Sequence, residues 1–441
     1  MSVLLVLPRW QVEPRDFKRC LDALALNFPD QEVTIAAWPE AAAAHQQALG
    51  LAAVQPYQRN QALDSFEAIA YVEVRGETEA QETSRLAPRK VYQFDFTYPY
   101  FRARPLLVAA SEVKDYFAHT EAHVFNRLAP YGSDFMYYFP YGYLFKCLGM
   151  GPLNEFGLRI KDDLANFEKR PENHKVLAVF GGSAAWSLDC LYPEMFSQRL
   201  EDYLNQWAQE SGSSLKFTVL NMGQHGNVVM NEMLTYLLLC NRIKPEVVIA
   251  HDGFNDFLYG AYCDPWLLKG HSLCYQDNLE QWSRILHNTK DRPLTHEGEG
   301  EYRVLNTPQA IVRAYVERKD QFRQIVLNRG DYFIWALQPF VHSKSGLAPI
   351  EQQYQERLAQ LTEAYGEAFR NMKMLYQSFT QAVRFPPEAD YIDFHQIFSQ
   401  YGADRHLFAD NVHPSPEGDD IIAQVYFDYI RQKIESGQWF A

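Results

Sequence analysis

Four short motifs carry the side chains that could do chemistry in this chain. They are Phe180-Gly-Gly-Ser183, Asn221-Met-Gly-Gln-His-Gly226, His251-Asp-Gly-Phe-Asn255-Asp256 and Asp410-Asn-Val-His413. A serine, a histidine and a carboxylate can act as a nucleophile, its general base and the group that orients the base. Backbone N–H groups and an asparagine amide can stabilise an oxyanion. These residue types therefore suit acyl transfer to a serine.

Each motif also has an ordinary structural explanation. A Gly-Gly-Ser turn is common, because glycine lets the chain turn without a Cβ clash. Asn255 and Asp256 could form an Asx-turn or cap a helix, and Asp256 suits that role better. Asp410 and His413 could lie on a surface loop or supply half of a metal site. Because we find no further ligands at supporting positions, we expect no metal.

The first three motifs each follow a predicted strand. The apolar runs lie at 176–180, 217–221 and 246–251, with predicted helices at 196–212 and 231–242 between them. Further strands are predicted at 331–338 and 391–394, a helical stretch at 349–383, and a last helix from Ser415-Pro416 onward. The carboxyl ends of parallel strands meet in one crevice. We therefore expect Ser183, which should face a helix N-terminus, to lie near Gly226 and Asn255.

Taken together, the four motifs resemble the Ser, Gly, Asn and Asp-x-x-His blocks of the SGNH (GDSL-like) hydrolases, in the same chain order. The resemblance covers roughly residues 130–441. It implies a three-layer, doubly wound parallel sheet of the flavodoxin-like kind. It also implies Ser183 as nucleophile, His413 as general base and Asp410 as the orienting group.

The resemblance further implies an oxyanion hole made by the Ser183 N–H, the Gly226 N–H and the Asn255 side chain. Gly223 competes with Gly226 for this role, and the family position favours Gly226. One departure is clear, because the family's Gly-Asp-Ser is Gly-Gly-Ser here. The nucleophile and the base are retained, so activity is not excluded.

The function that the resemblance implies is a serine hydrolase cleaving O-acyl esters through an acyl-serine intermediate. The expected substrate is a small-molecule or carbohydrate ester, with O-acetyl groups on a carbohydrate favoured. The alternatives are a carbohydrate O-acetyltransferase and a non-catalytic binding module. Retention of all four blocks argues against the binding module. We expect activity to rise between pH 5 and 8, as a histidine base loses its proton.

Several neighbours of the motifs could shape a pocket or fill the core. Trp186, His225, Phe254 and Phe257 are of this kind, with the core at least as well favoured for each. His251 is expected to be a buried histidine at a strand end. His406 is expected to line the entrance of the site.

The first 125 residues alternate strands and helices and predict a smaller α/β domain of a Rossmann-like kind. Strands are predicted at 3–7, 32–38, 68–74, 91–96 and 106–110. This region has neither G-x-G-x-x-G nor a P-loop, and its sequence predicts no function for it. Residues 126–174 are expected to form an aromatic-rich connecting segment, in which Phe135–Phe145 is either a loop between domains or a sugar-binding or acyl-binding wall. Residues 175–441 are then the SGNH-like domain, with a helical insertion around 260–385 that caps the site.

The bulk composition excludes some classes of partner. The 441 residues carry 41 Lys+Arg against 55 Asp+Glu, a net charge of −14, which argues against a nucleic-acid ligand. No segment approaches the ~20 apolar residues of a membrane span, and no polybasic run suggests a membrane surface. The six cysteines are scattered and predict reduced thiols. We therefore expect a cytoplasmic protein without a cofactor, whose oligomeric state stays open.

Overall fold

The computed structural model contains two compact units, each with its own sheet. They are described separately below. The described residues are 2–12, 14–28, 31–57, 66–73, 90–95, 102–107, 137–138, 142–143, 154, 158–262, 306–360, 363–383 and 389–440.

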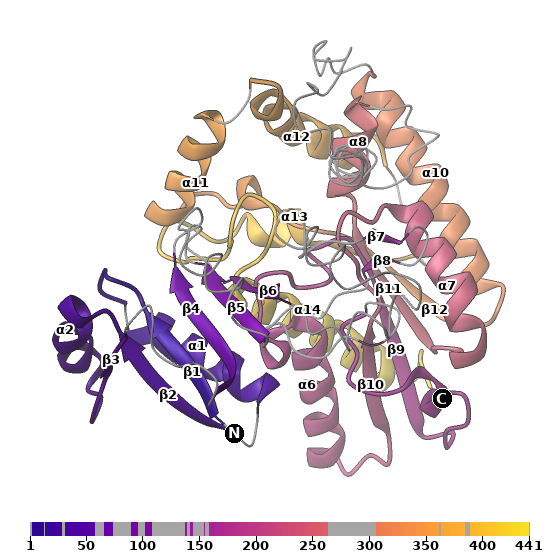
Figure 1. Cartoon of the computed structure of the whole chain (residues 1–441). Coiled ribbons are helices and arrows are strands. Elements are labelled where there is room, and N and C mark those ends of the chain that lie inside the picture. Colours follow the sequence, from indigo (N-terminus) through magenta and orange to yellow (C-terminus); the bar gives the residue numbers. More distant parts are fainter. Residues whose placement is uncertain are drawn as a thin grey trace, which may run out of the picture. The chain divides into compact units, whose positions relative to one another are not determined.

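The first unit contains a six-stranded sheet in the order β3-β2-β1-β4-β5-β6 (Figure 1). Its strands are β1 (Ser2–Leu7), β2 (Glu32–Ala37), β3 (Gln55–Pro56), β4 (Phe66–Glu73), β5 (Lys90–Asp95) and β6 (Arg102–Leu107). The helices α1 (Pro14–Asn27) and α2 (Pro39–Leu49) follow β1 and β2. The order 3-2-1-4-5 is that of the Rossmann fold. Only β6 runs antiparallel to its neighbour, so the expected smaller α/β domain is present as a mixed sheet.

The second unit contains a five-stranded, wholly parallel sheet in the order β10-β9-β11-β12-β13. Its strands are β9 (His174–Gly181), β10 (Lys216–Asn221), β11 (Val247–Asp252), β12 (Tyr332–Leu337) and β13 (Asp390–Asp393). This is the flavodoxin-like order 2-1-3-4-5. The topological switch falls between β9 and β11. The strands that carry the serine and asparagine motifs are therefore neighbours at the place where such sheets bind ligands.

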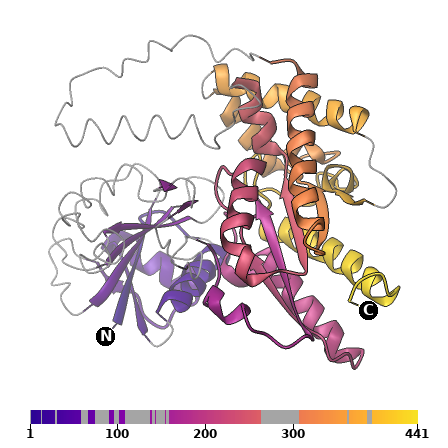
Figure 2. The same ribbon diagram turned by 90° about the vertical axis from the view of Figure 1, so that its right-hand side faces the viewer.

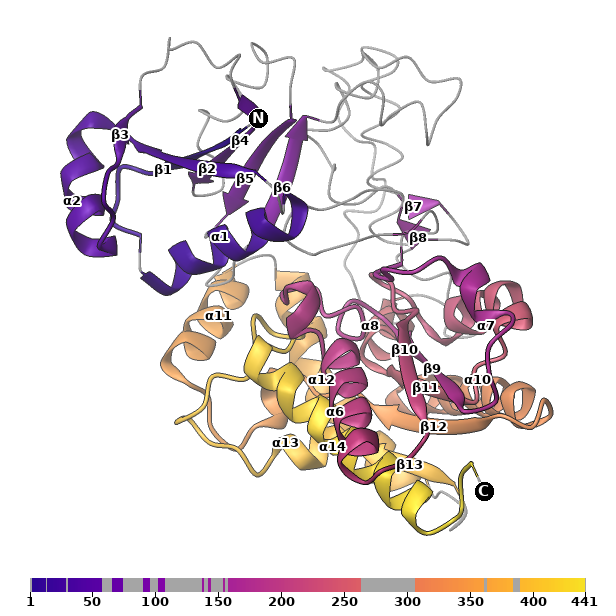
Figure 3. The same ribbon diagram turned by 90° about the horizontal axis from the view of Figure 1, so that it is seen from below.

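Helices cover both faces of this sheet (Figures 1 and 3). One face carries α7 (Val229–Ile243), α8 (Phe254–Tyr262), α10 (Pro308–Leu327) and α12 (Glu363–Ala382). The other carries α6 (Phe196–Glu210), α13 (Phe394–Phe398) and α14 (Pro416–Glu435), which leads toward the C-terminus in Figure 2. The remaining short elements are α11 (Pro349–Gln360), η1 (Leu164–Phe167), η2 (Tyr192–Glu194), η3 (Val341–Ser343), β7 (Tyr137–Tyr138) and β8 (Gly142–Tyr143).

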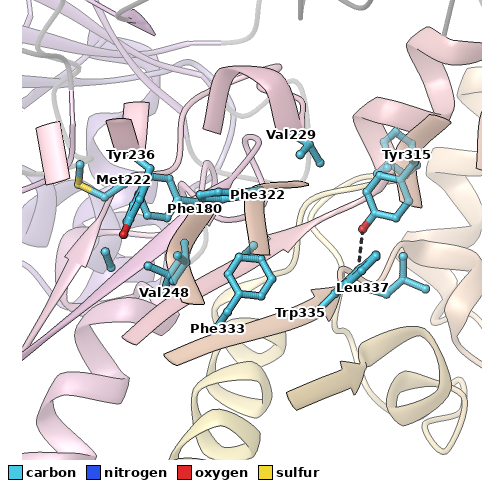
Figure 4. Packing of buried hydrophobic residues seen from close by; sticks show 14 of the residues in the cluster. Phe180, Met222, Val229, Tyr236, Val248, Tyr315, Phe322, Phe333, Trp335 and Leu337 are labelled. Carbon is cyan, nitrogen blue, oxygen red and sulfur yellow. Dashed lines mark hydrogen bonds between the residues drawn. The ribbon is translucent and has the colours of Figure 1, made fainter. Parts of the chain in front are cut away.

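The alternation of side chains along each strand produces these two faces. Val176, Ala178 and Phe180 of β9 pack on the α7 and α10 side, where Figure 4 shows Phe180 near Tyr236 and Phe322. Leu177 and Val179 point to the α6 and α14 side. Every residue of β9 from Val176 to Gly181 is buried. These residues are apolar without alternation, as expected for a parallel strand that is covered on both faces. The predicted three-layer, doubly wound fold is present.

One local prediction was wrong. No regular helix follows Ser183 directly, because residues 182–190 form hydrogen-bonded turns such as Trp186 N–H to Gly182 O, 3.0 Å, and α6 begins only at Phe196. The helical stretch predicted at 349–383 is present as α11 and α12. The helix predicted at 231–242 begins two residues earlier, at Val229.

Several predictions concern residues outside the described ranges. They are the aromatic side chains of 135–145 and the thiols of Cys147, Cys263 and Cys274. Cys20, Cys190 and Cys240 are buried free thiols, as expected. In the part of the chain that is described, no helix has both the length and the apolar character needed to cross a membrane.

Candidate active site

Ser183, His413 and Asp410 form a hydrogen-bonded row beyond the carboxyl end of β9. His413 Nε2 lies 2.6 Å from Ser183 Oγ, and His413 Nδ1 lies 2.7 Å from Asp410 Oδ2. Ser183 is half-buried, and the exposed fractions of the His413 and Asp410 side chains are 13% and 23%. A hydroxyl, an imidazole and a carboxylate in this order can transfer the serine proton to the imidazole.

The Asp410 carboxylate is held in its charged form by hydrogen bonds. Its Oδ1 accepts from the Val412 N–H at 2.7 Å and the His413 N–H at 2.9 Å. Burial acts to raise the pKa of Asp410, but the His413 charge and these hydrogen bonds outweigh it and hold the pKa well below its usual range. Asp410 is therefore ionised across the neutral range and fixes the orientation of the imidazole.

The two glycines before Ser183 lie in close contact with the asparagine motif. Gly181 has a φ of +152°, and a Cβ there would lie 2.1 Å from His251 O. A Cβ on Gly182 would lie 2.3 Å from Asn255 Nδ2. The Asn255 amide therefore lies directly against the Gly182 backbone.

The three groups expected to face an oxyanion come from neighbouring loops. Asn255 Nδ2 donates to Asn227 O at 2.9 Å, which ties the start of α8 to the loop that carries Gly226. Gly226 has a φ of +64°, a conformation that glycine adopts without strain. Among the described residues, neither the Ser183 N–H nor the Gly226 N–H donates to another protein group. The role of these two amides in an oxyanion hole stays a prediction.

Gly223 is in a different position. Its N–H donates to Asn221 Oδ1 at 3.0 Å, and a Cβ on it would lie 2.8 Å from Trp186 N. This glycine is needed for close packing against the serine turn. Its amide is engaged, whereas that of Gly226 is not.

Arg159 holds the serine turn and was missed by the sequence analysis. The buried guanidinium donates to Trp186 O at 3.0 Å, Ser187 O at 2.7 Å and Cys190 O at 2.9 Å. Asn221 Nδ2 adds a bond to Ala185 O at 3.0 Å. Nothing in the sequence around Arg159 signals this role, because its partners are backbone carbonyls about 30 positions away.

A buried ion pair holds the loop of Asp410 and His413. Lys344 Nζ and Glu351 Oε2 lie 2.5 Å apart, and both side chains are fully buried. Glu351 Oε1 accepts from the Leu407 N–H at 2.9 Å and the Phe408 N–H at 3.0 Å. The loop then closes on itself through Ala409 N–H to His413 O, 2.7 Å. Neither Lys344 nor Glu351 was predicted.

A second buried polar cluster lies behind the asparagine motif. Asp252, at the end of β11, pairs with Lys319 and accepts from Tyr315 Oη at 2.8 Å. Glu232 and Asp256 are buried in the same cluster. Asp256 lies within the first turn of α8, so its expected role as a cap of its own helix was wrong. It caps the neighbouring α7 through the Val229 N–H, 3.3 Å from its Oδ2, rather than its own helix.

The other predicted neighbours are mostly core residues. The Trp186 and His225 rings are buried against each other, with centroids 4.2 Å apart, while Phe254 and Phe257 belong to the core on the α7 face. His251 is fully buried beside Tyr426 Oη at 2.8 Å, and burial lowers its pKa to about 3. It is therefore neutral, as expected for a core histidine.

His406 stays a prediction. Its Nε2 lies 2.9 Å from Phe408 O, within the same loop as Asp410.

One group of ligand-type atoms lies in the site. The Asp189, Asp410 and His413 atoms are within 4.8 Å of one another. Both imidazole nitrogens of His413 already make hydrogen bonds, to Ser183 and Asp410. The arrangement is therefore that of a base with carboxylate partners, and the expectation of no metal stays a prediction.

Comparison with known proteins gives matches to solved structures alone. No protein-family model matches the chain, and no curated protein matches it. The acetyl xylan esterase AlAXEase is 14% identical, with a TM-score of 0.31, over 58% of this chain and 99% of that one. A lipase/acylhydrolase from Enterococcus faecalis is 15% identical, with a TM-score of 0.32, over 59% and 96%. A putative GDSL-like lipase from Parabacteroides merdae is 16% identical, with a TM-score of 0.30, over 58% and 94%.

Proposed function

We propose that this chain is a serine hydrolase that cleaves O-acyl esters through an acyl-Ser183 intermediate. The observation that carries the proposal is the row of Ser183, His413 and Asp410, with distances of 2.6 and 2.7 Å between successive groups. A serine on an ordinary surface turn has no imidazole at hydrogen-bond distance to act as its base. The order of groups is the one that activates a hydroxyl nucleophile.

The proposed reaction starts with attack of Ser183 Oγ on the acyl carbonyl carbon. His413 Nε2 takes the hydroxyl proton, and Asp410 stabilises the imidazolium that forms. The carbonyl oxygen gains negative charge and faces the amides of Ser183 and Gly226 and the side chain of Asn255. The intermediate then expels the alcohol, which receives the proton from His413.

Water completes the cycle. His413 takes a proton from a water molecule, whose oxygen attacks the acyl-serine carbonyl. The second tetrahedral intermediate uses the same three donors, and its collapse releases the acid and restores Ser183. Fixed donors of this kind cost no reorganisation when the charge develops, which is why they contribute strongly to catalysis.

The substrate class that we propose is an O-acetyl group on a carbohydrate. This narrower proposal rests on the family resemblance of the four motifs. It is tested by acetate release from acetylated sugars. Adding an alcohol acceptor, and looking for an acylated product, separates hydrolysis from the acetyltransferase alternative.

The first test is turnover of p-nitrophenyl acetate by the native chain and by Ser183→Ala. We expect kcat to fall by roughly a millionfold in the variant, as for nucleophile removal in serine hydrolases. Ser399→Ala is the matched control, since that hydroxyl donates to Gln396 O at the end of α13, and it should keep full activity. Equal turnover in Ser183→Ala would overturn the proposal. A phosphonate probe that labels the native chain and not Ser183→Ala would support it independently.

A further inference from the structure

His413 faces a second carboxylate besides Asp410. His413 Nδ1 lies 3.8 Å from Asp189 Oδ2, and the Asp189 side chain is 1% exposed. Asp410 Oδ2 lies nearer, at 2.7 Å, and is more exposed, at 23%. One imidazole nitrogen is thus directed at two carboxylates, the more deeply buried of which was not among the predicted site residues.

The position of Asp189 is fixed by the turn that also carries the nucleophile. It lies six residues after Ser183. The Arg159 guanidinium holds the carbonyls of Ser187 and Cys190 on either side of it, at 2.7 and 2.9 Å. The Cys190 N–H closes the turn onto Ser187 O at 3.1 Å. A displacement of Asp189 would therefore require the serine turn itself to move.

Helix α14 gives the serine turn further support. Asp419 is fully buried and accepts from the Phe196 N–H at 3.0 Å, which ties the start of α14 to the start of α6. In the described part of the chain, the titratable and charged groups around the serine turn include Arg159, Arg199, Asp189 and Asp419, with Asp410 on the opposing loop, and burial raises the pKa of Asp419 to about 7. Of these, the two that lie within 4 Å of the His413 imidazole are Asp189 and Asp410.

Burying a carboxylate is costly unless a positive charge or donors compensate it. The imidazolium that forms when His413 accepts a proton is such a charge. Because little water reaches Asp189, its field at the imidazole is weakly screened. Its effect is largest in the state in which the imidazole carries the proton, and that state is the one next to the transition state.

We infer that Asp189 is a positioning residue that acts through His413 as its second carboxylate partner. It stabilises the imidazolium alongside Asp410. When Asp410 is neutralised, the His413 ring shifts toward Asp189, which then accepts the Nδ1–H. The inference rests on the proposed function for its catalytic consequence. Its electrostatic part, the coupling of Asp189 to His413, stands without any activity.

The electrostatic test is an NMR titration of the His413 imidazole in the native chain, Asp189→Asn and Asp428→Asn. His413→Gln identifies the signal. Asp428→Asn is the matched control, because it removes the same charge from an exposed site on α14, where Asp428 pairs with Arg431 at 3.2 Å. We expect the titration midpoint to fall by about one unit in Asp189→Asn and to stay in place in the control. An unchanged midpoint in Asp189→Asn would refute the inference, whether or not the chain is an esterase.

The catalytic test is a double-mutant cycle of kcat/KM with Asp189→Asn, Asp410→Asn and the pair. We expect Asp189→Asn alone to lower kcat/KM about tenfold. In the Asp410→Asn background the same substitution should lower it clearly more, because His413 then has neither carboxylate partner. If the loss of kcat/KM in the double variant equals the product of the two single losses, Asp189 does not replace Asp410 as the partner of His413. If Asp189→Asn does not fold, Asp189→Ser serves in both tests, and thermal unfolding of each variant shows which one to use. Absence of Ser183-dependent turnover would count against the proposed function and leave the titration to decide the inference.

Discussion

At the scale of single residues, the site depends on contacts that a side chain of another size would break. Ser183 Oγ lies 2.6 Å from His413 Nε2, and Gly181 and Gly182 leave no Cβ between the serine turn and the asparagine loop. Asn255 fills the space beside Gly182 and bonds to Asn227 O. The nucleophile, the proposed oxyanion donor and the glycine between them therefore form one packed unit.

The pH dependence of activity follows from His413. Asp410 stays ionised because its pKa is held well below its usual range. We therefore expect any change of activity near neutral pH to come from the His413 imidazole, since histidine is the side chain whose charge ordinarily changes there. We expect kcat/KM to rise with pH between 5 and 8, as the base loses its proton. A pH–rate profile on an activated ester checks this. A profile that is flat over that range would show that His413 is not the base.

Gly182→Ala tests the proposed role of Asn255. The new Cβ would lie 2.3 Å from Asn255 Nδ2 and would displace the amide. We expect kcat to fall by about 10²–10³, the cost of losing one oxyanion donor. The control is the same substitution in an Asn255→Ala background, where the methyl group has room and should cost little more. A full additional loss there would mean that Gly182 acts on something other than Asn255.

At the scale of elements, two loops from distant parts of the sequence are held by buried side chains on backbone groups. Arg159 binds three carbonyls of the serine turn, and Glu351 binds two amides of the histidine loop. Loops carry function when a rigid scaffold positions them. In this chain the scaffold includes charged side chains that bond to the loop backbone as well as the strand ends.

Arg159→Met tests that support. It would leave three buried carbonyls without their charged donor, and hydrogen bonds to charged groups contribute about 1.5–3 kcal/mol each. We expect the free energy of unfolding to fall by about 3 kcal/mol or more, with a loss of turnover. Urea denaturation measures the first, and p-nitrophenyl acetate hydrolysis the second. Arg242→Met, which removes an exposed pair with Glu168, should cost less than about 1 kcal/mol. Equal costs in the two variants would contradict the proposed support.

At the scale of the whole second unit, acidic groups are buried where the asparagine motif meets α7 and α10. Burial, followed by the Asp252 charge, raises the pKa of Asp256 to about 8. The same causes raise that of Glu232 well above its usual range. The cluster therefore holds protons at neutral pH that the unfolded chain would release. Stability and pH are coupled through this cluster.

Asp256→Asn tests the coupling. Between pH 4 and 8 the folded chain binds the Asp256 proton and the unfolded chain does not, so this group lowers the stability progressively as the pH rises. The asparagine cannot ionise and mimics the neutral acid. We expect the melting temperature of the variant, relative to that of the native chain, to increase from pH 4 to pH 8. Thermal unfolding between pH 4 and pH 8 measures this difference in melting temperature, with the exposed Asp428→Asn as control. A constant difference would show that Asp256 is ionised in the folded chain.

The sequence by itself determined the elements and their class. The apolar runs at 176–180, 217–221 and 246–251 became β9, β10 and β11, because strands buried on both faces must be apolar throughout. Ser415-Pro416 marked the start of α14, where the Ser415 hydroxyl accepts from the Gly418 N–H. The resemblance of the four motifs also predicted which residues gather, since Ser183, Asp410 and His413 were named from it and lie within hydrogen-bond distance of one another.

What only the tertiary structure decided is how those residues are held and what else faces them. Arg159, Glu351 and Asp189 have no local signature, because each acts on backbone or side chains that folding brings near from other segments. The irregular turns after Ser183 likewise depend on Arg159 and Asn221 rather than on local helix propensity. Periodicity in a sequence records which faces are buried. The partners of a buried charge depend on the chain's path in three dimensions, and that path is set by the packing of the whole unit.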